Sequence, residues 1–195
     1  MGGTFDPVHW GHLILAEQAR ERFGLAKVLF VTAAQPPHKV GECVTDVAYR
    51  LEMTRLAIAD NELFECSTIE IDRPGPSYTV DTIERILETS GEGTEVYLLL
   101  GADEGRDLMT WREPYRIQKL ANVVVANRPG LPVAGVIDSL PEDFRGGIVP
   151  LEMPGVDISS TDLRERVRSG RSIRYLVPRP VEEYIWANGL YVDQG

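Results

Sequence analysis

The stretch HLILAEQARERFGLAKVLFVT, residues 12–32, places a helix directly before a strand and decides the fold class. Residues 12–23 predict a helix, and Gly24 stands where a helix stop is expected. Residues 27–32 form a nearly continuous apolar run, which is typical of a parallel strand covered by helices on both faces. The stretch therefore predicts an α/β protein.

The same alternation continues along the chain. Further strands are predicted at 64–71, 96–100, 122–126 and 148–153, and further helices at 46–60, 79–88, 114–121, 159–169 and 180–188. This order predicts a doubly wound open parallel sheet, Rossmann-like, in a single domain over 1–195 with a small C-terminal helical part from about 159–195. The Pro/Gly-rich stretches 34–45 and 128–147 are expected to be long loops that form the binding site.

Composition narrows the class of partner. The 195 residues carry 30 acidic and 20 basic side chains, for a net charge of −10. This balance argues against a nucleic-acid polymer or an anionic membrane as partner, but not against a small polyphosphate ligand. Cys43 and Cys66 have neither metal-site nor disulfide-framework spacing, so we expect free thiols in a cytoplasmic protein.

Residues 1–12, MGGTFDPVHWGH, resemble a phosphate-binding loop that runs into a helix. Glycines allow close approach of the backbone to an anion, and the helix start offers unpaired N–H groups. His9 and His12 can donate hydrogen bonds and carry partial positive charge near neutral pH. A plain turn or a two-histidine metal pair remains an alternative, although a metal site would need a third ligand.

Other short segments each allow a functional and a structural interpretation. Gln35–Lys39, QPPHK, follows a strand and adds two cationic donors, but many exposed loops hold a lysine. Residues 77–79, SYT, and 101–103, GAD, are either site residues or simple caps and turns. Trp111 and Arg112 suit a flat heterocycle or plain packing, and the hydroxyls of ISSTDLR, 158–164, hold a phosphate or cap a helix.

Taken together, these segments resemble the nucleotidyltransferase superfamily marked by an HxGH motif, here residues 9–12, and a late ISSTxxR motif, here residues 158–164. The resemblance is greatest to the bacterial nicotinate mononucleotide adenylyltransferases. It rests on GGTFDPVHWGH, PPHK, SYT, GAD, Trp111 and NRPG (127–130), which occur in the family's order across nearly the whole chain.

The resemblance implies transfer of AMP from ATP to nicotinate mononucleotide, with Mg²⁺ carried by the ATP phosphates and no metal ligand from the protein. It implies catalytic roles for His9, His12, Lys39 and Arg164. It implies that ATP is bound by Gly3, Thr4, Phe5, Gly101, Asp103, Ser160 and Thr161, and the pyridine nucleotide by Thr79, Trp111 and Arg112. It allows the protein to form a homo-oligomer but does not require it.

This chain departs from the family pattern at its start. Family members have a central strand before GGTFDP, so we expect the natural chain to begin upstream of Met1, and a chain lacking that strand to be unstable. Arg112 beside Trp111 is also unusual. The remaining alternatives are another HxGH adenylyl- or cytidylyltransferase, acting on pantetheine phosphate or nicotinamide mononucleotide, and a nucleotide sensor without catalysis.

Overall fold

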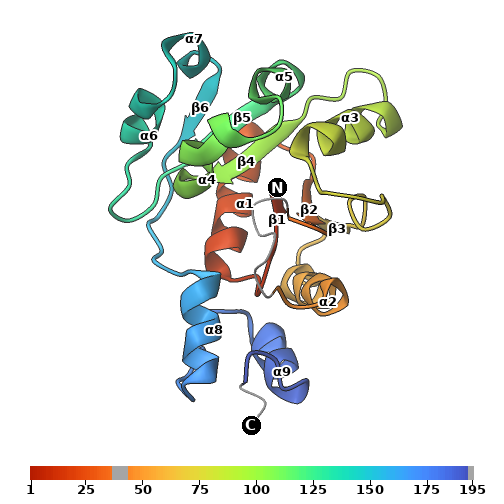
Figure 1. Ribbon diagram of the computed structural model, residues 1–195, viewed down its shortest axis with the longest axis vertical. Coiled ribbons are helices and arrows are strands. Elements are labelled where there is room, and N and C mark those ends of the chain that lie inside the picture. The colour runs from red at the N-terminus through yellow and green to blue at the C-terminus, as the bar shows by residue number, and fades with distance from the viewer. Residues whose placement is uncertain (37–43, 193–195) are drawn as a thin grey trace.

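The computed structural model of the protein describes residues 1–36 and 44–192, in which helices and parallel strands alternate (Figure 1). The strands are β1 Gly2–Gly3, β2 Val28–Thr32, β3 Phe64–Ser67, β4 Tyr97–Gly101, β5 Asn122–Ala126 and β6 Ile148–Leu151. The helices are α1 Trp10–Phe23, α2 Val47–Ile58, α3 Thr79–Thr89, α4 Ala102–Asp107, the 3₁₀ helix η2 Leu108–Thr110, α5 Pro114–Leu120, α6 Val133–Ser139, α7 Glu142–Arg145, α8 Ser160–Arg168 and α9 Arg179–Ala187. None of these helices is long and apolar enough to cross a membrane.

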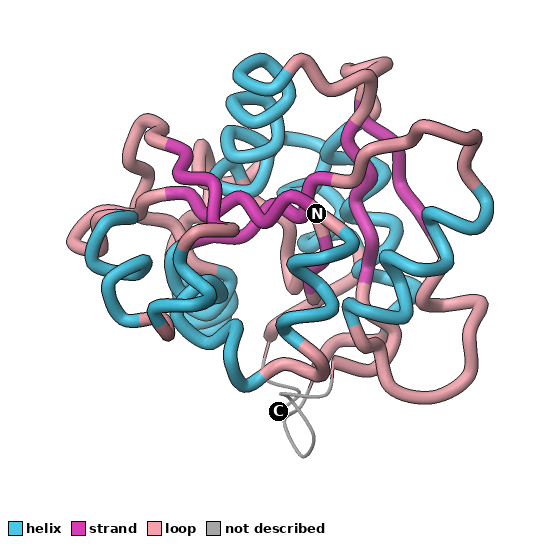
Figure 2. Tube along the Cα trace, turned by 90° about the horizontal axis from the view of Figure 1, so that it is seen from above, coloured by secondary structure: helices cyan, strands magenta, loops and turns pink. Residues whose placement is uncertain are grey.

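The strands form two three-stranded parallel sheets, seen as two groups in Figure 2. One sheet has the order β1-β2-β3 and the other β4-β5-β6. Gly2 pairs with Val31 at the start of the first sheet, and Leu99 pairs with Val124 in the second. The α/β class with parallel strands is therefore confirmed. The expected single sheet is divided, since no backbone ladder joins β1 to β4 among the described residues.

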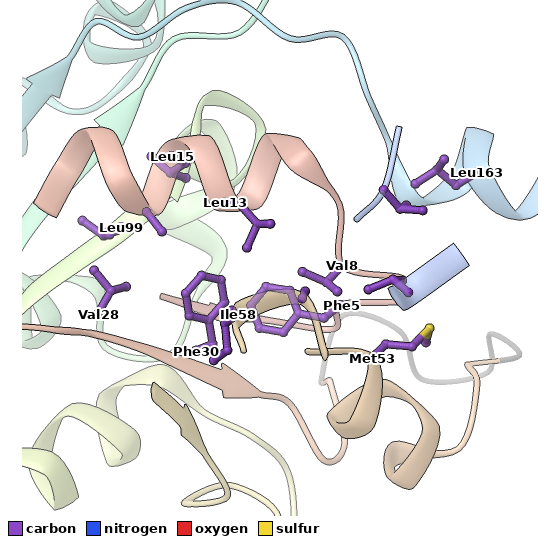
Figure 3. Packing of buried hydrophobic residues seen from close by; sticks show 14 of the residues in the cluster. Phe5, Val8, Leu13, Leu15, Val28, Phe30, Met53, Ile58, Leu99 and Leu163 are labelled. Carbon is purple, nitrogen blue, oxygen red and sulfur yellow. The ribbon is translucent and has the colours of Figure 1, made fainter. Parts of the chain in front are cut away.

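Helix α1 packs on the first core, which Figure 3 shows from close by. Leu13 of α1 points toward Phe30 of β2 (Figure 3), Leu15 belongs to the same buried cluster, and Phe5 joins it from the loop before the helix. Gly24 ends α1 in the left-handed conformation with φ 62°, as its position predicts. The helix begins at Trp10, two residues before the predicted start, because its first turn includes part of the HxGH motif.

The expectation of a long loop over 128–147 is wrong. These residues contain α6 and α7, and Val133, Val136 and Phe144 are buried in the second core beside β5 and β6. The apolar side chains are few and interspersed with Pro and Gly, so the helical period is hard to detect in the sequence. Only the start of this stretch reaches the cleft described below.

Helices α8 and α9 lie together at one end of the molecule, and α9 packs against α2 (Figure 1). Leu163 of α8 and Ile185 of α9 are buried in the same cluster as Leu13 of α1. The C-terminal helices thus close the core under the loop that precedes α1. This placement brings Tyr191, after α9, into hydrogen-bond contact with Asp6 of that loop.

Candidate active site

A cleft of about 550 Å³ opens where the carboxyl ends of β1 and β4 face the starts of α1 and α3. Most of the predicted site residues line it: Gly3, Thr4, Phe5, His9, His12, Thr79, Gly101, Asp103, Trp111, Arg112 and Ser160. Thr161 and Arg164 are not part of the lining. Lys39 lies outside the described residues, as do His38 and Cys43. The size suits a nucleotide ligand.

The loop before α1 is held in an unusual backbone conformation. Phe5 has φ 49° and is only 2% exposed, so its ring is part of the core although it also lines the cleft. A side chain at Gly3 would place its Cβ 2.8 Å from the Phe5 ring, which explains the glycine at that position. A non-glycine residue with positive φ persists only where its surroundings hold it, and here the buried ring does so.

The two imidazoles of the HxGH motif stack on each other at the floor of the cleft. Their centroids lie 3.8 Å apart, with 28° between the ring planes. The backbone N–H of His9 donates to Nδ1 of His12 at 3.2 Å, so Nδ1 of neutral His12 carries no proton and Nε2 does. A Cβ at Gly11 would lie 3.1 Å from Cε1 and Nδ1 of His9, so the glycine makes room for that ring.

Burial keeps both imidazoles neutral. The pKa of His9 is lowered to about 4, chiefly by burial and further by the charge of Arg128. The pKa of His12 is also well below its usual value, because of burial and the adjacent His9. Burial therefore favours the neutral, hydrogen-bond-donating form of both imidazoles. Nδ1 of His9 has no partner among the described residues, so its hydrogen-bonding capacity is not used by this part of the protein.

These pKa values predict how stability depends on pH. Between pH 6.5 and about 4 the unfolded chain binds a proton at His9 that the folded protein does not, so stability falls as pH falls. We expect His9 alone to lower the free energy of unfolding by about 2 kcal/mol between pH 7 and pH 5. Urea unfolding at both pH values measures this loss, and His9→Gln should reduce it. An equal loss in wild type and variant would contradict the assignment.

The ISSTDLR segment caps α8 and contacts the loop before α1. Ser159 caps α8 by accepting from the Asp162 N–H at 3.1 Å, as its position predicts. The Ser160 hydroxyl donates to the Pro7 carbonyl at 2.9 Å, and Arg164 donates to the Asp6 carbonyl at 2.8 Å. These two side chains thus hold the loop before α1.

The SYT and Trp-Arg segments meet on the opposite wall. Ser77 does not cap α3, since its hydroxyl accepts from the N–H groups of Ala34 and Gln35 at 3.1 and 3.3 Å. Thr79 is the first residue of α3, after Tyr78 as N-cap. The Arg112 guanidinium lies 4.7 Å from the centroid of the Tyr78 ring, a cation–π contact. This wall therefore combines aromatic surface with a cation.

One charged residue of the cleft, Arg128, received no role from the sequence. It forms ion pairs with Asp103 and Asp157, the second at 3.5 Å, and so joins the end of β4 to the segment before α8. Its position two residues after the end of β5 could have identified it, because ligands bind at the carboxyl ends of strands in such sheets. The described residues contain no group of three His, Cys, Asp or Glu side chains that could hold a metal ion.

Comparisons with known proteins agree with this geometry. The sequence model of the cytidylyltransferase-like family matches residues 1–166. A Thermoanaerobacter protein named "Probable nicotinate-nucleotide adenylyltransferase" is 46% identical over 194 residues, covering 98% of this chain and 92% of that protein. A Thermus thermophilus protein of the same name is 47% identical over 190 residues, covering 97% and 96%.

A solved structure extends the comparison to the fold. The Plasmodium falciparum nicotinic acid mononucleotide adenylyltransferase complexed with NaAD has a TM-score of 0.80 to this chain, covering 97% of this chain and 94% of that one. The sequence identity is 17%, so this similarity concerns the fold alone.

Proposed function

The chain belongs to the cytidylyltransferase-like family, and we propose that it is a nicotinate-nucleotide adenylyltransferase of NAD biosynthesis. It transfers AMP from ATP to nicotinate mononucleotide, giving deamido-NAD and pyrophosphate. The observation that carries the proposal is the stacked His9–His12 pair, with a fixed tautomer, at the floor of a nucleotide-sized cleft.

The reaction needs alignment and charge stabilisation rather than a protein nucleophile. An oxygen of the nicotinate mononucleotide phosphate attacks the α-phosphorus of ATP, and the bond to the bridging α–β oxygen breaks. The pyrophosphate leaves with the electron pair of that bond. Aligned donors that meet the charge on the α-phosphate and on the leaving group supply most of the catalysis in such a transfer.

The residues of the HxGH loop fit this task. Nε2–H of His12 donates to the α-phosphate or the departing pyrophosphate, and His9 stands beside it as a second donor. Dianionic phosphate bound against the rings would raise their pKa and favour the charged form. The backbone of Gly3, Thr4 and Phe5 lines the cleft and is proposed to run along the phosphates. Lys39, which lies outside the described residues, is proposed as a further cation.

Further predicted site residues lie near this loop. Gly101, Asp103 and Ser160 line the nucleotide cleft, and Thr161 and Arg164, which follow Ser160 in α8, are proposed to bind the triphosphate. Thr79, Trp111 and Arg112 bind the pyridine nucleotide at the opposite wall. Mg²⁺ carried by the ATP phosphates would be coordinated by their oxygens and by water, and would neutralise charge there. We expect the protein to act in the cytoplasm without a nucleic-acid or membrane partner.

An adenylyl-transfer assay tests the function. Pyrophosphate release from ATP is measured in parallel with nicotinate mononucleotide, nicotinamide mononucleotide and phosphopantetheine, and CTP replaces ATP in a matched series. We expect deamido-NAD from ATP and nicotinate mononucleotide as the fastest product. Faster turnover of another pair would reassign the substrate, and ATP binding without release from any acceptor would favour a sensor.

A further inference from the structure

A buried carboxylate outside the cleft, that of Asp6, anchors the loop that presents the two histidines. Asp6 lies in this loop and is 3% exposed, yet its carboxylate does not line the cleft. The Tyr191 hydroxyl donates to Oδ1 of Asp6 at 2.7 Å, and the Thr45 N–H donates to Oδ2 at 3.2 Å. Both carboxylate oxygens are therefore used by segments distant in the sequence.

Tyr191 is fixed as firmly as its partner. It has φ 65°, an unfavourable backbone conformation for a residue with a side chain, so its surroundings must hold it there. Its ring packs against the first core, and its hydroxyl lies 3.8 Å from Sδ of Met53. Burial and the adjacent Asp6 raise the pKa of Tyr191 far above its usual value, so the phenol stays a donor at every working pH.

The contact reaches the histidines through a short stretch of backbone. His9 follows Asp6 by three residues, and the Asp6 carbonyl accepts from Arg164 at 2.8 Å. A shift of the Asp6 side chain would therefore move the backbone that sets the position of the His9 ring. Catalytic donors must be placed to within a fraction of an ångström to act on a transition state.

We propose that Tyr191 is a positioning residue for the proposed adenylyl transfer: acting through Asp6, its hydroxyl holds the loop that presents His9 and His12 to the ATP phosphates. The C-terminal segment after α9 thus contributes to the site without touching the substrate. The kinetic test of this inference rests on the proposed function. The effect of Tyr191 on ATP binding can be measured without it.

Tyr191→Phe tests the proposal because it removes one hydroxyl and keeps the ring in the core. We expect the KM for ATP to rise about five- to tenfold, kcat to fall by a similar factor, and the KM for nicotinate mononucleotide to stay within twofold. Assays are run where circular dichroism shows the variant to be folded. Tyr184→Phe of α9 is the matched control: its ring lies against Tyr49, and its hydroxyl makes no hydrogen bond to the loop in the part of the chain that the structure describes, so it should leave all three constants unchanged.

A double-mutant cycle separates positioning from a general structural effect. If Tyr191 acts through Asp6, Tyr191→Phe should cause no further loss in an Asp6→Ala background. Additive losses would overturn the proposal, as would a fall in kcat with both KM values unchanged, or ATP constants within twofold of wild type. If the wild-type protein forms no deamido-NAD, the proposed function fails, and calorimetric Kd values for ATP in the wild-type and Tyr191→Phe proteins still decide this inference.

Discussion

Replacing His12 with alanine should lower kcat about 100- to 1,000-fold while the protein stays folded. His12 lines the cleft, and its Nε2 carries the ring proton because its Nδ1 accepts from the His9 backbone N–H. Removing one preorganised donor of this kind costs a factor of about 10²–10³ in turnover. The lost capping bond is expected to cost about 1 kcal/mol of stability, or about 2–4 °C in Tm. Steady-state kinetics and thermal melts measure both effects.

Two isosteric variants separate the donor from the cap. His12 is the third residue of α1, where glutamine or glutamate accepts from the N-cap N–H in a capping box. Both His12→Gln and His12→Glu should therefore recover the lost stability, but only glutamine can also donate to a phosphate. We expect His12→Gln to be more active than His12→Ala, and His12→Glu to be less active than His12→Ala. An active His12→Ala enzyme, or equal rates for Gln and Glu, would contradict the role of His12.

The sequence predicts the elements of this fold better than their details. The apolar run at β5 has the same bounds in the structure as in the prediction, because a strand buried on both faces contains little but apolar residues. Helices α6 and α7 were missed, because short helices with few apolar positions show no clear period. The division of the strands into two sheets depends on backbone pairing, which composition does not encode.

For the site, too, the sequence predicts which residues meet better than it predicts their surroundings. Motif spacing predicted that His9 and His12 would lie together, and they do. It could not predict the lowered pKa of His9, because that depends on burial and on Arg128, which follows β5 more than a hundred residues away in the sequence. Nor could it predict that Ser160 and Arg164 contact the loop of Asp6 and Pro7, since that requires α8 to pack beside the start of α1.

The burial of Arg50 is the feature of the structure that its sequence indicates least. We expect its replacement to cause a large loss of stability. In the sequence it is one charged residue of a helix, but in the structure it is 1% exposed. Its guanidinium donates to the carbonyls of Thr4 and Ala33 at 2.8 Å each, to Thr45 at 2.8 Å and to Ala34 at 3.4 Å. It thus joins the histidine loop to the segments on both sides of residues 37–43.

Replacing Arg50 with methionine should therefore destabilise the protein by about 3 kcal/mol. Methionine fills much of the volume but leaves buried carbonyls without donors, at about 1–3 kcal/mol each before water or local shifts compensate. Burial also lowers the pKa of Arg50, against the opposing charge of Asp6, so the site already bears the cost of desolvating a cation. Part of the loss is thereby offset, which is why the expected value lies well below the sum over four carbonyls.

Urea unfolding and thermal melts measure this change, with an expected fall in Tm of about 6–12 °C. Arg55→Met is the matched control on the same helix, since its side chain is 54% exposed and pairs with Glu52 at 3.6 Å. That variant should stay within about 0.5 kcal/mol of wild type.

If the Arg50 contacts also hold Thr4 in place, Arg50→Met should raise the KM for ATP below its melting temperature, whereas Arg55→Met should not. Stability within 1 kcal/mol of wild type would mean that water replaces the guanidinium at these carbonyls, contrary to a rigid buried network.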